Sequence, residues 1–397
     1  MGSFGSPEET SLSEVFGIEQ AYCGCTETEV IVEKLELGWF LPTAGDSTSL
    51  GDPTNRIPAS MDMYERVVAA AEAAGFEYLL VPIQTECWEA WITSAMMIGR
   101  SNSIRMLVAV RPGYVNPFLA AKMISTFDQL SGGRICVNLI AGQSEAESRA
   151  EGILIGKEER YTQMEEEVRV MKALWTAKGP LDFEGRFISL TGARVVPKPL
   201  QQPYPRFYLG GGSGQAWEIS AQHADVHLFW GDTYERIGEN IQTIRAMSQR
   251  YERRAPIRFG MRLQIVCRET EAQAWAAANE LMRGVTERHT EKLRAHVSES
   301  EANRRVQELA ATHGDLIESN LWTGITKIRP GAGIAIVGDP QQCADVMQRY
   351  IDLGCDSFCL SGYLHDEEAT RFARFVRPIL ERRNPGRLSP LAIGSTG

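Results

Sequence analysis

The chain has 397 residues, of which 41 are basic and 51 acidic, so its formal net charge is −10. Its hydrophobic content of 43% and charged content of 23% are those of a folded protein and exclude a disordered one. The acidic balance and the lack of an apolar run of about 18 residues argue against nucleic acid or a membrane as partner. The eight cysteines are scattered, which favours free thiols in the cytoplasm.

Composition divides the chain into three parts. Residues 1–35 hold seven Glu and one Lys without a long apolar period, and we expect a flexible or peripherally packed N-terminal extension there. Residues 36–385 alternate apolar runs with helical patterns, and we assign them to a single barrel domain. We assign residues 386–397 to a C-terminal tail.

Eight short β-type runs alternate with helical patterns along the central domain. Strands that alternate with helices pair in parallel through βαβ crossovers, and eight such units predict a closed (β/α)8 TIM barrel. An open doubly wound sheet would need a glycine-rich first turn, and none follows the first strand. The predicted strands are residues 35–41, 78–83, 105–110, 135–140, 206–209, 226–230, 258–266 and 356–360, and the predicted helices are residues 63–74, 88–99, 117–130, 162–175, 215–224, 234–249, 271–283, 341–353 and 367–380.

Two long insertions interrupt this alternation, and both follow predicted strands. The first comprises residues 143–160 and 176–205, with a hairpin predicted around residues 183–187. The second, residues 291–333, is rich in charge. Because active sites of such barrels lie at the C-terminal ends of the strands, insertions in these loops typically form lids or substrate walls. We expect residues 291–333 to form a lid.

A glycine-rich turn at residues 210–214 follows the fifth predicted strand and opens a helix. Glycines let backbone N–H groups approach a phosphate, and a helix N-terminus favours negative charge. Late in a barrel this is the usual place of a phosphate site. The turn therefore predicts a phosphorylated cofactor, although glycine turns also occur for steric reasons alone.

Three arginines, Arg111, Arg262 and Arg329, lie in or beside apolar strand-like runs. An unpaired cation is costly to bury, so each is either neutralised by an internal salt bridge or available to a ligand. Three together favour an anionic ligand such as a sulfonate, a phosphate or a carboxylate. We expect no metal, since no HxH pair or carboxylate-bridged set is visible, and no serine hydrolase, since a G-x-S-x-G elbow is lacking.

A set of short motifs is spread over residues 37–380. The motifs are WFLPT (39–43), RP (111–112), DQLSGGR (128–134), NLIAG (138–142), ERY (159–161), GGGS (210–213), FGMRL (259–263), RPGAGIAIVG (329–338) and LSGYLH (360–365). Together they resemble the bacterial luciferase-like flavin monooxygenases. Since the last three motifs are characteristic of the sulfonate branch, the chain most resembles the FMNH₂-dependent alkanesulfonate monooxygenases.

The resemblance implies a two-component enzyme on a (β/α)8 barrel. A separate NAD(P)H:flavin reductase would supply FMNH₂ as a co-substrate, which agrees with the lack of a dinucleotide fingerprint in this chain. With O₂, the enzyme would oxygenate a small organosulfonate and cleave its C–S bond to give an aldehyde and sulfite, a step of sulfur metabolism. We also expect a homo-oligomer.

The resemblance also assigns roles to individual residues. Arginines would hold the anion, whereas Tyr363 or His365 would deliver or remove a proton. Each residue could instead have a structural role, as a packed ring, a buried thiol or a loop cap. The cofactor-binding residues carry over to Asn138, Gly142, Tyr161, Gly211, Gly212 and Ser213, and the catalytic residues to Cys87, Trp230, Arg262, Arg329, Tyr363 and His365.

Two positions depart from the sulfonate branch. Ala44 stands where relatives carry His, and Gln264 stands where they carry the His of an Arg-x-His sequence. Both missing imidazoles would face the flavin or the sulfonate, so a different organic substrate is an alternative. Two other functions stay open: a deazaflavin-dependent oxidoreductase of the same fold, which transfers hydride without O₂, and a flavin-binding protein without catalysis.

Overall fold

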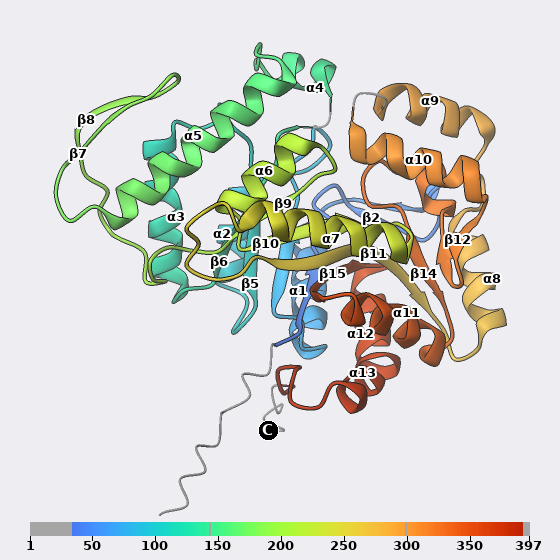
Figure 1. Cartoon of the computed structure of the whole chain (residues 1–397). Coiled ribbons are helices and arrows are strands. Elements are labelled where there is room, and N and C mark those ends of the chain that lie inside the picture. The colour runs from blue at the N-terminus through green and yellow to red at the C-terminus, as the bar shows by residue number, and fades with distance from the viewer. Residues whose placement is uncertain (1–33, 143, 298–299, 392–397) are drawn as a thin grey trace, which may run out of the picture. The chain divides into compact units, whose positions relative to one another are not determined.

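Eight parallel strands close into a barrel in the part of the chain that the computed structural model describes, residues 34–142, 144–297 and 300–391 (Figure 1). In ring order they are β1 (Glu36–Phe40), β4 (Tyr78–Val81), β5 (Arg105–Val110), β6 (Ile135–Leu139), β9 (Phe207–Gly210), β10 (Val226–Trp230), β11 (Arg258–Cys267) and β15 (Cys355–Ser361). The ring closes because β15 pairs in parallel with both β11 and β1. The predicted (β/α)8 TIM barrel is confirmed.

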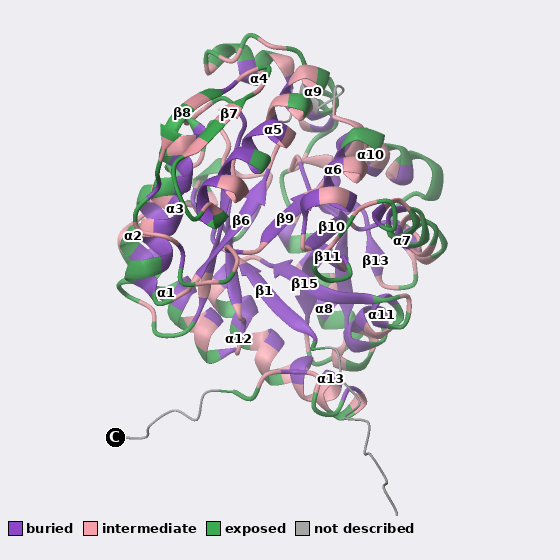
Figure 2. Cartoon of the chain, turned by 60° about the vertical axis from the view of Figure 1, so that its left-hand side comes forward, coloured by how far each residue is buried: buried purple, intermediate pink, exposed green. Residues whose placement is uncertain are grey.

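Helices surround the barrel and bury the sides that face the strands, as Figure 2 shows. In α1, for example, Met63, Val67 and Ala71 recur at every fourth position and are buried, and Ser60 caps the helix. The predicted helix 367–380 is divided in two because Pro378, which has no N–H, begins a new helix. The helices are α1 (Met61–Ala73), α2 (Ala90–Ile98), α3 (Pro117–Ser131), α5 (Lys157–Thr176), α6 (Gly214–His223), α7 (Tyr234–Ser248), α8 (Glu271–Leu281), α11 (Pro340–Asp352), α12 (His365–Phe375) and α13 (Arg377–Arg383).

The two predicted insertions carry their own secondary structure. The first holds α4 (Glu145–Ala150) and the predicted hairpin, which is confirmed as antiparallel strands β7 (Leu181–Glu184) and β8 (Ser189–Ala193). The second holds α9 (Glu287–Val297), α10 (Glu301–His313), β12 (Leu316–Glu318), β13 (Leu321–Trp322), η2 (Gly324–Lys327) and β14 (Ala335–Gly338). The loop after β1 contains β2 (Asp46–Ser47), η1 (Pro53–Asn55) and β3 (Arg56–Ile57). No helix among the described residues has the length and apolar composition needed to cross a bilayer.

Strand β11 is long enough to serve two sheets. Its first residues, from Arg258 to Arg262, pair with β10 inside the barrel. From Gln264 to Cys267 it pairs instead with β14, which lies outside the ring. The strand therefore leaves the barrel near Arg262, and this side chain lies at the C-terminal end of the barrel, where ligands of such folds bind.

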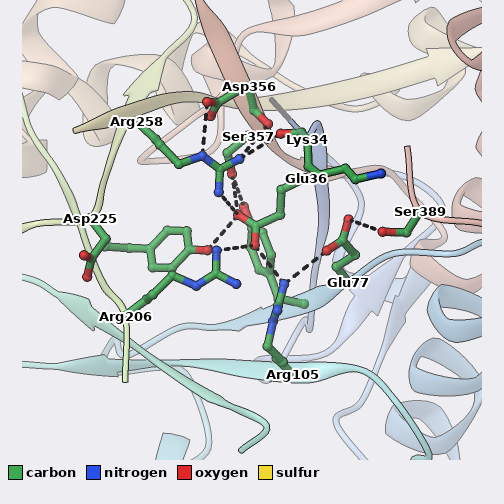
Figure 3. A network of polar contacts seen from close by, with 12 residues as sticks. Lys34, Glu36, Glu77, Arg105, Arg206, Asp225, Arg258, Asp356, Ser357 and Ser389 are labelled. Atoms are coloured by element: carbon green, nitrogen blue, oxygen red, sulfur yellow. Dashed lines mark hydrogen bonds and ion pairs between the residues drawn. The ribbon is translucent and has the colours of Figure 1, made fainter. Parts of the chain in front are cut away.

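At the opposite end of the barrel, an ion cluster surrounds the carboxylate of Glu36 (Figure 3). Its oxygens lie 2.8 Å from Arg105, 3.2 Å from Arg206 and 3.9 Å from Arg258, and they accept a hydrogen bond from the Tyr208 hydroxyl at 2.7 Å. Burial alone would raise the pKa of Glu36, but the three arginines outweigh it and hold that pKa below its usual value. Glu77 also pairs with Arg105 and Asp356 with Arg258, so the charges of the cluster are balanced within the fold.

Candidate active site

Two cavities lie at the C-terminal ends of the barrel strands, and between them they are lined by every residue predicted for the site. The first, which we call the glycine-turn cavity, is lined by Asn138, Gly142, Tyr161, Gly211, Gly212, Ser213, Trp230 and Arg262. The second, which we call the Phe40 cavity, has a volume of about 510 Å³ and is lined by Phe40, Cys87, Arg329, Tyr363 and His365, among others. The Arg262 guanidinium lies over the Phe40 ring, 4.7 Å from its centroid, so the two cavities adjoin.

The glycine turn lies where β9 passes into α6. Ser213 caps this helix, because its Oγ accepts a hydrogen bond of 3.2 Å from the N–H of Ala216. Tyr161 hydrogen-bonds Ser213, and burial raises the pKa of this phenol, which therefore stays neutral. Gly211 has a φ of +139°, and a Cβ there would lie only 3.0 Å from the Cβ of Ala216, so the turn needs glycine. The hydroxyls and the N-terminus of α6 form a cradle that fits a phosphate.

Two cations that the sequence reasoning missed complete this cradle. Lys157 and Arg160 belong to the first turn of α5, and both line the glycine-turn cavity. Arg160 is held in place, since its Nε donates to the Ala141 carbonyl at 2.9 Å and its Nη1 lies 3.1 Å from a carboxylate oxygen of Glu145. The ERY motif contained this signal, because Arg160 directly precedes Tyr161 in a helix that starts with a cation.

Arg262 is buried without a carboxylate partner among the described residues. Its Nη1 donates to two backbone carbonyls, those of Leu263 at 2.9 Å and Cys359 at 3.4 Å. Burial and the nearby charge of Arg329 lower the pKa of Arg262 to about 10, so the side chain stays a cation at neutral pH. A charge that the protein leaves unneutralised at a barrel mouth is suited to an anionic ligand.

Arg329, which is only half-buried, lies on the other side of the boundary between the cavities. Its guanidinium lies 5.3 Å from the Phe40 ring centroid, and the described residues include no carboxylate paired with it. It hydrogen-bonds Tyr363. Burial raises the pKa of Tyr363, although both arginines oppose the shift, so the hydroxyl keeps its proton at neutral pH. The two arginines and the phenol therefore present only hydrogen-bond donors to an anion.

His365 lies on the floor of the Phe40 cavity and is held by Asp46, which the sequence reasoning missed. The Nδ1 of His365 lies 2.9 Å from Oδ2 of Asp46, and the same oxygen accepts the His365 backbone N–H at 2.8 Å. Burial would raise the pKa of Asp46, but His365 outweighs it and lowers that pKa. The carboxylate lies against Nδ1 without a well-aligned hydrogen bond to it, so Nε2 is the ring nitrogen left to exchange a proton. No sequence pattern joins two residues 319 positions apart.

Cys87 and Trp230 form walls of the site. Burial raises the pKa of the Cys87 thiol, despite a hydrogen bond with Thr43 and the charge of Arg329, so this side chain is a thiol and not a thiolate. Trp230 ends β10 beside Arg262 and lines the glycine-turn cavity.

Two expectations need correction. Arg111 is not available to an anion, because it lies 3.0 Å from Glu147 and 2.6 Å from Glu151 in the first insertion and forms the internal salt bridge that was its alternative. Gln264 does not line either cavity. Its amide oxygen accepts from Ser361 at 2.7 Å, and its nitrogen donates to the Ala332 carbonyl at 3.1 Å. Ala44, in contrast, lines the Phe40 cavity as expected.

The described residues contain no group of three or more His, Cys, Asp or Glu side chains placed to hold a metal ion. The six described cysteines are all free thiols.

These features define a barrel enzyme with an anion cradle next to two unneutralised arginines. The family described as luciferase-like monooxygenase matches residues 35–357, and the chain belongs to this family of flavin-dependent monooxygenases.

Several solved structures share the fold. An EDTA monooxygenase from Chelativorans sp. BNC1 is 18% identical, with a TM-score of 0.71 over 91% of this chain and 96% of its own. A riboflavin lyase, solved with modified FMN and riboflavin, is 18% identical, with a TM-score of 0.75 over 91% of this chain and 93% of its own. An F420-dependent secondary alcohol dehydrogenase is 16% identical, with a TM-score of 0.59 over 87% and 99%. At these identities the likeness establishes the fold and leaves the substrate open.

Proposed function

We propose that this chain is the oxygenating component of a two-component monooxygenase that uses FMNH₂ and O₂ to convert a small organosulfonate into an aldehyde and sulfite. The observation that carries the proposal is the pair of arginines, Arg262 and Arg329, without carboxylate partners among the described residues. Membership of a flavin-dependent monooxygenase family supports the redox half of the proposal. The missing dinucleotide fingerprint supports a separate NAD(P)H:flavin reductase as partner.

The glycine-turn cavity suits the phosphate end of the cofactor. Reduced FMN, when bound, supplies the electrons that activate O₂. Ser213, Tyr161 and the first N–H groups of α6 would hold its phosphate, with Gly211 and Gly212 allowing close approach of the backbone. Lys157 would supply positive charge to the phosphate, whereas Arg160, which is paired with Glu145, would fix the wall of the cradle. Asn138 and Gly142 would form the wall nearest the ring system.

The boundary between the two cavities suits the sulfonate. The planar guanidinium groups of Arg262 and Arg329 match pairs of sulfonate oxygens and hold the reacting carbon beside Phe40. Tyr363, protonated at neutral pH, can donate a proton, and His365, oriented by Asp46, can accept one. Cys87 and Trp230 would exclude water from the reacting atoms.

The second insertion is placed to close the site. Glu301 and Ala302 of α10 line the glycine-turn cavity, and Arg329 of the same insertion lines the Phe40 cavity together with His289, which directly precedes the insertion in α9. Closure of this lid is a prediction. Limited proteolysis should cut the insertion in the free enzyme and spare it when reduced FMN and substrate are bound.

Sulfite release tests the proposed function. The enzyme, a flavin reductase, NADH and FMN are incubated in air with a panel of organosulfonates, and sulfite and aldehyde are measured. We expect equal amounts of both, and neither product without O₂. Turnover with reduced F420 in the absence of O₂ would identify the deazaflavin alternative, and FMN binding without any turnover would identify a non-catalytic protein.

A further inference from the structure

The Phe40 cavity extends well beyond the arginine pair. Its floor is formed by Thr43, Asp46 and His365, which are buried, and its rim includes the exposed Arg56 and the half-buried His289. A cavity of about 510 Å³ falls within the range that accommodates drug-sized ligands and exceeds the needs of a two-carbon or three-carbon sulfonate. The rim is therefore available to a part of the substrate far from the sulfonate.

Arg56 is a cation at this rim without a carboxylate partner among the described residues. Its Nη2 donates to the carbonyl of Ala44 at 2.9 Å, which fixes the guanidinium against the cavity wall and leaves its other N–H groups unused. Asp52, a carboxylate at the same rim, is directed to its own loop and not to Arg56, because it accepts hydrogen bonds from the Thr54 N–H at 2.9 Å, the Thr54 hydroxyl at 2.7 Å and the Asn55 amide at 3.1 Å.

His289, which is distant from Arg56 in the sequence, adds a second hydrogen-bond donor at this rim. It lies in the first turn of α9, and its Nδ1 accepts the N–H of Thr286 at 3.3 Å. With Nδ1 serving as the acceptor, the ring proton is on Nε2, and Nε2 is a donor in both the neutral and the protonated imidazole. Ala44, between the floor and the rim, presents only a methyl group and leaves room for a chain that connects the two ends.

We propose that Arg56 and His289 form a distal subsite that binds a second anionic group, so that the substrate is an organosulfonate with a carboxylate at its other end. This inference rests on the proposed function, because it takes the sulfonate to be held by Arg262 and Arg329. A guanidinium and an imidazole N–H are both good donors to a carboxylate. The carboxylate of the ligand would also form an ion pair with Arg56.

Binding calorimetry tests the subsite independently of turnover. The full chain, with FMN present, is titrated with a series of alkane-1-sulfonates and with the same sulfonates that carry a terminal carboxylate. We expect one chain length at which the carboxylate tightens binding by about threefold to fivefold, because an ion pair with an exposed arginine contributes up to about 1 kcal/mol. Arg56→Gln and His289→Ala should each remove most of this gain and leave the binding of the plain sulfonate unchanged.

The control is Arg250→Gln, which removes an equal charge from an exposed arginine that is paired with Glu218 and lines neither cavity. It should leave both affinities as they are. Equal binding of the two ligand series, or equal losses for both in the two rim variants, would overturn the subsite, as would the absence of any binding. If the proposed function is wrong and the subsite is right, the result is different. The carboxylate-bearing sulfonates would still bind more tightly in calorimetry, but no sulfite would be released from either series.

Discussion

The two ends of the barrel hold arginines in opposite ways. At the N-terminal end, Arg105, Arg206 and Arg258 surround the carboxylate of Glu36, while Glu77 also pairs with Arg105 and Asp356 with Arg258, so the cluster supplies its own counter-charges (Figure 3). At the C-terminal end, the buried guanidinium of Arg262 has only backbone carbonyls as partners. Burial of an unpaired charge costs free energy, so the cluster at the N-terminal end carries its own counter-charges, and we propose that a ligand brings the counter-charge to Arg262. The pairing state of an arginine, more than its burial, separates the two roles.

Glu167 of α5 is a third buried ionisable group, and its charge is opposite to that of Arg262. This carboxylate has no cation partner among the described residues and accepts only the N–H of Gly113 at 2.8 Å and the amide of Gln163 at 2.9 Å. Burial raises its pKa to about 7. We therefore expect the loss of charge at Glu36, at Arg262 and at Glu167 to change stability or binding in three different ways.

The largest effect is expected for Glu36→Gln. The neutral amide would remove the carboxylate that three part-buried arginines share and leave Arg206 without one among the described residues, although Arg105 keeps Glu77 and Arg258 keeps Asp356, and the free energy of unfolding should fall by about 3–5 kcal/mol. Urea unfolding followed by circular dichroism measures this loss. Glu65→Gln, which breaks an exposed pair with Arg100, is the control and should cost less than about 1 kcal/mol. Equal effects of the two substitutions would contradict the account of the cluster.

The pH dependence of this cluster has a definite sign. Because folding lowers the pKa of Glu36, its contribution to stability is complete above the pKa of the unfolded chain, near 4.5, and is lost as the pH falls below that value. Wild-type protein should therefore lose stability more steeply than Glu36→Gln in acid.

Arg262→Met should separate binding from stability. The loss of a bidentate guanidinium should lower kcat/KM for the sulfonate about 100-fold, since each charge-assisted hydrogen bond contributes about 1.5–3 kcal/mol. The free energy of unfolding should stay the same or rise, because a buried unpaired cation is removed. Arg111→Met is the matched control: it breaks an internal salt bridge and should destabilise the fold. A destabilised Arg262→Met would argue that this arginine is structural.

Ser213→Ala should weaken FMNH₂ binding about tenfold, because the phosphate loses one hydrogen bond from the helix cap. Riboflavin, which has no phosphate, should be affected much less. The measurement is anaerobic titration followed by tryptophan fluorescence. Equal losses for the two flavins would show that Ser213 does not contact the phosphate.

Glu167→Gln should give the smallest effect, and one that depends on pH. The folded pKa of about 7 lies above that of an exposed glutamate, so ionisation of Glu167 reduces stability as the pH rises from about 4.5 to 7. The amide should therefore stabilise the fold by at least about 1 kcal/mol at pH 8 and be close to neutral at pH 5. Thermal unfolding of the wild-type protein and of Glu167→Gln at the two pH values measures this effect. An equal change in stability at both pH values would contradict a raised pKa of Glu167.

The fold could be predicted from the sequence because each strand and helix is encoded locally. Alternating apolar runs and helical spacings are continuous stretches, and all eight barrel strands overlap the predicted ones. The hairpin in the first insertion was similarly visible in a short stretch of sequence.

The site could be predicted only in part, because charge pairing is not local. Arg111 looked like Arg262 in sequence, and its partners Glu147 and Glu151 lie 36 and 40 positions further on, in an insertion. Asp46 could not be linked to His365 for the same reason. Gln264 was expected at the ligand because the resemblance places a family His there, but its amide is bound to Ser361 of β15 and to the Ala332 carbonyl.

We propose that Arg262 and Arg329 are unneutralised because the ligand brings the negative charge. The most direct test is calorimetric titration of the FMN-bound protein with an alkane-1-sulfonate and with the methyl sulfone of the same chain, which has a similar shape and no charge. The account predicts that the sulfonate binds at least about tenfold more tightly than the sulfone, and that Arg262→Met abolishes the difference. Equal affinities for the two compounds in the wild-type protein would contradict it.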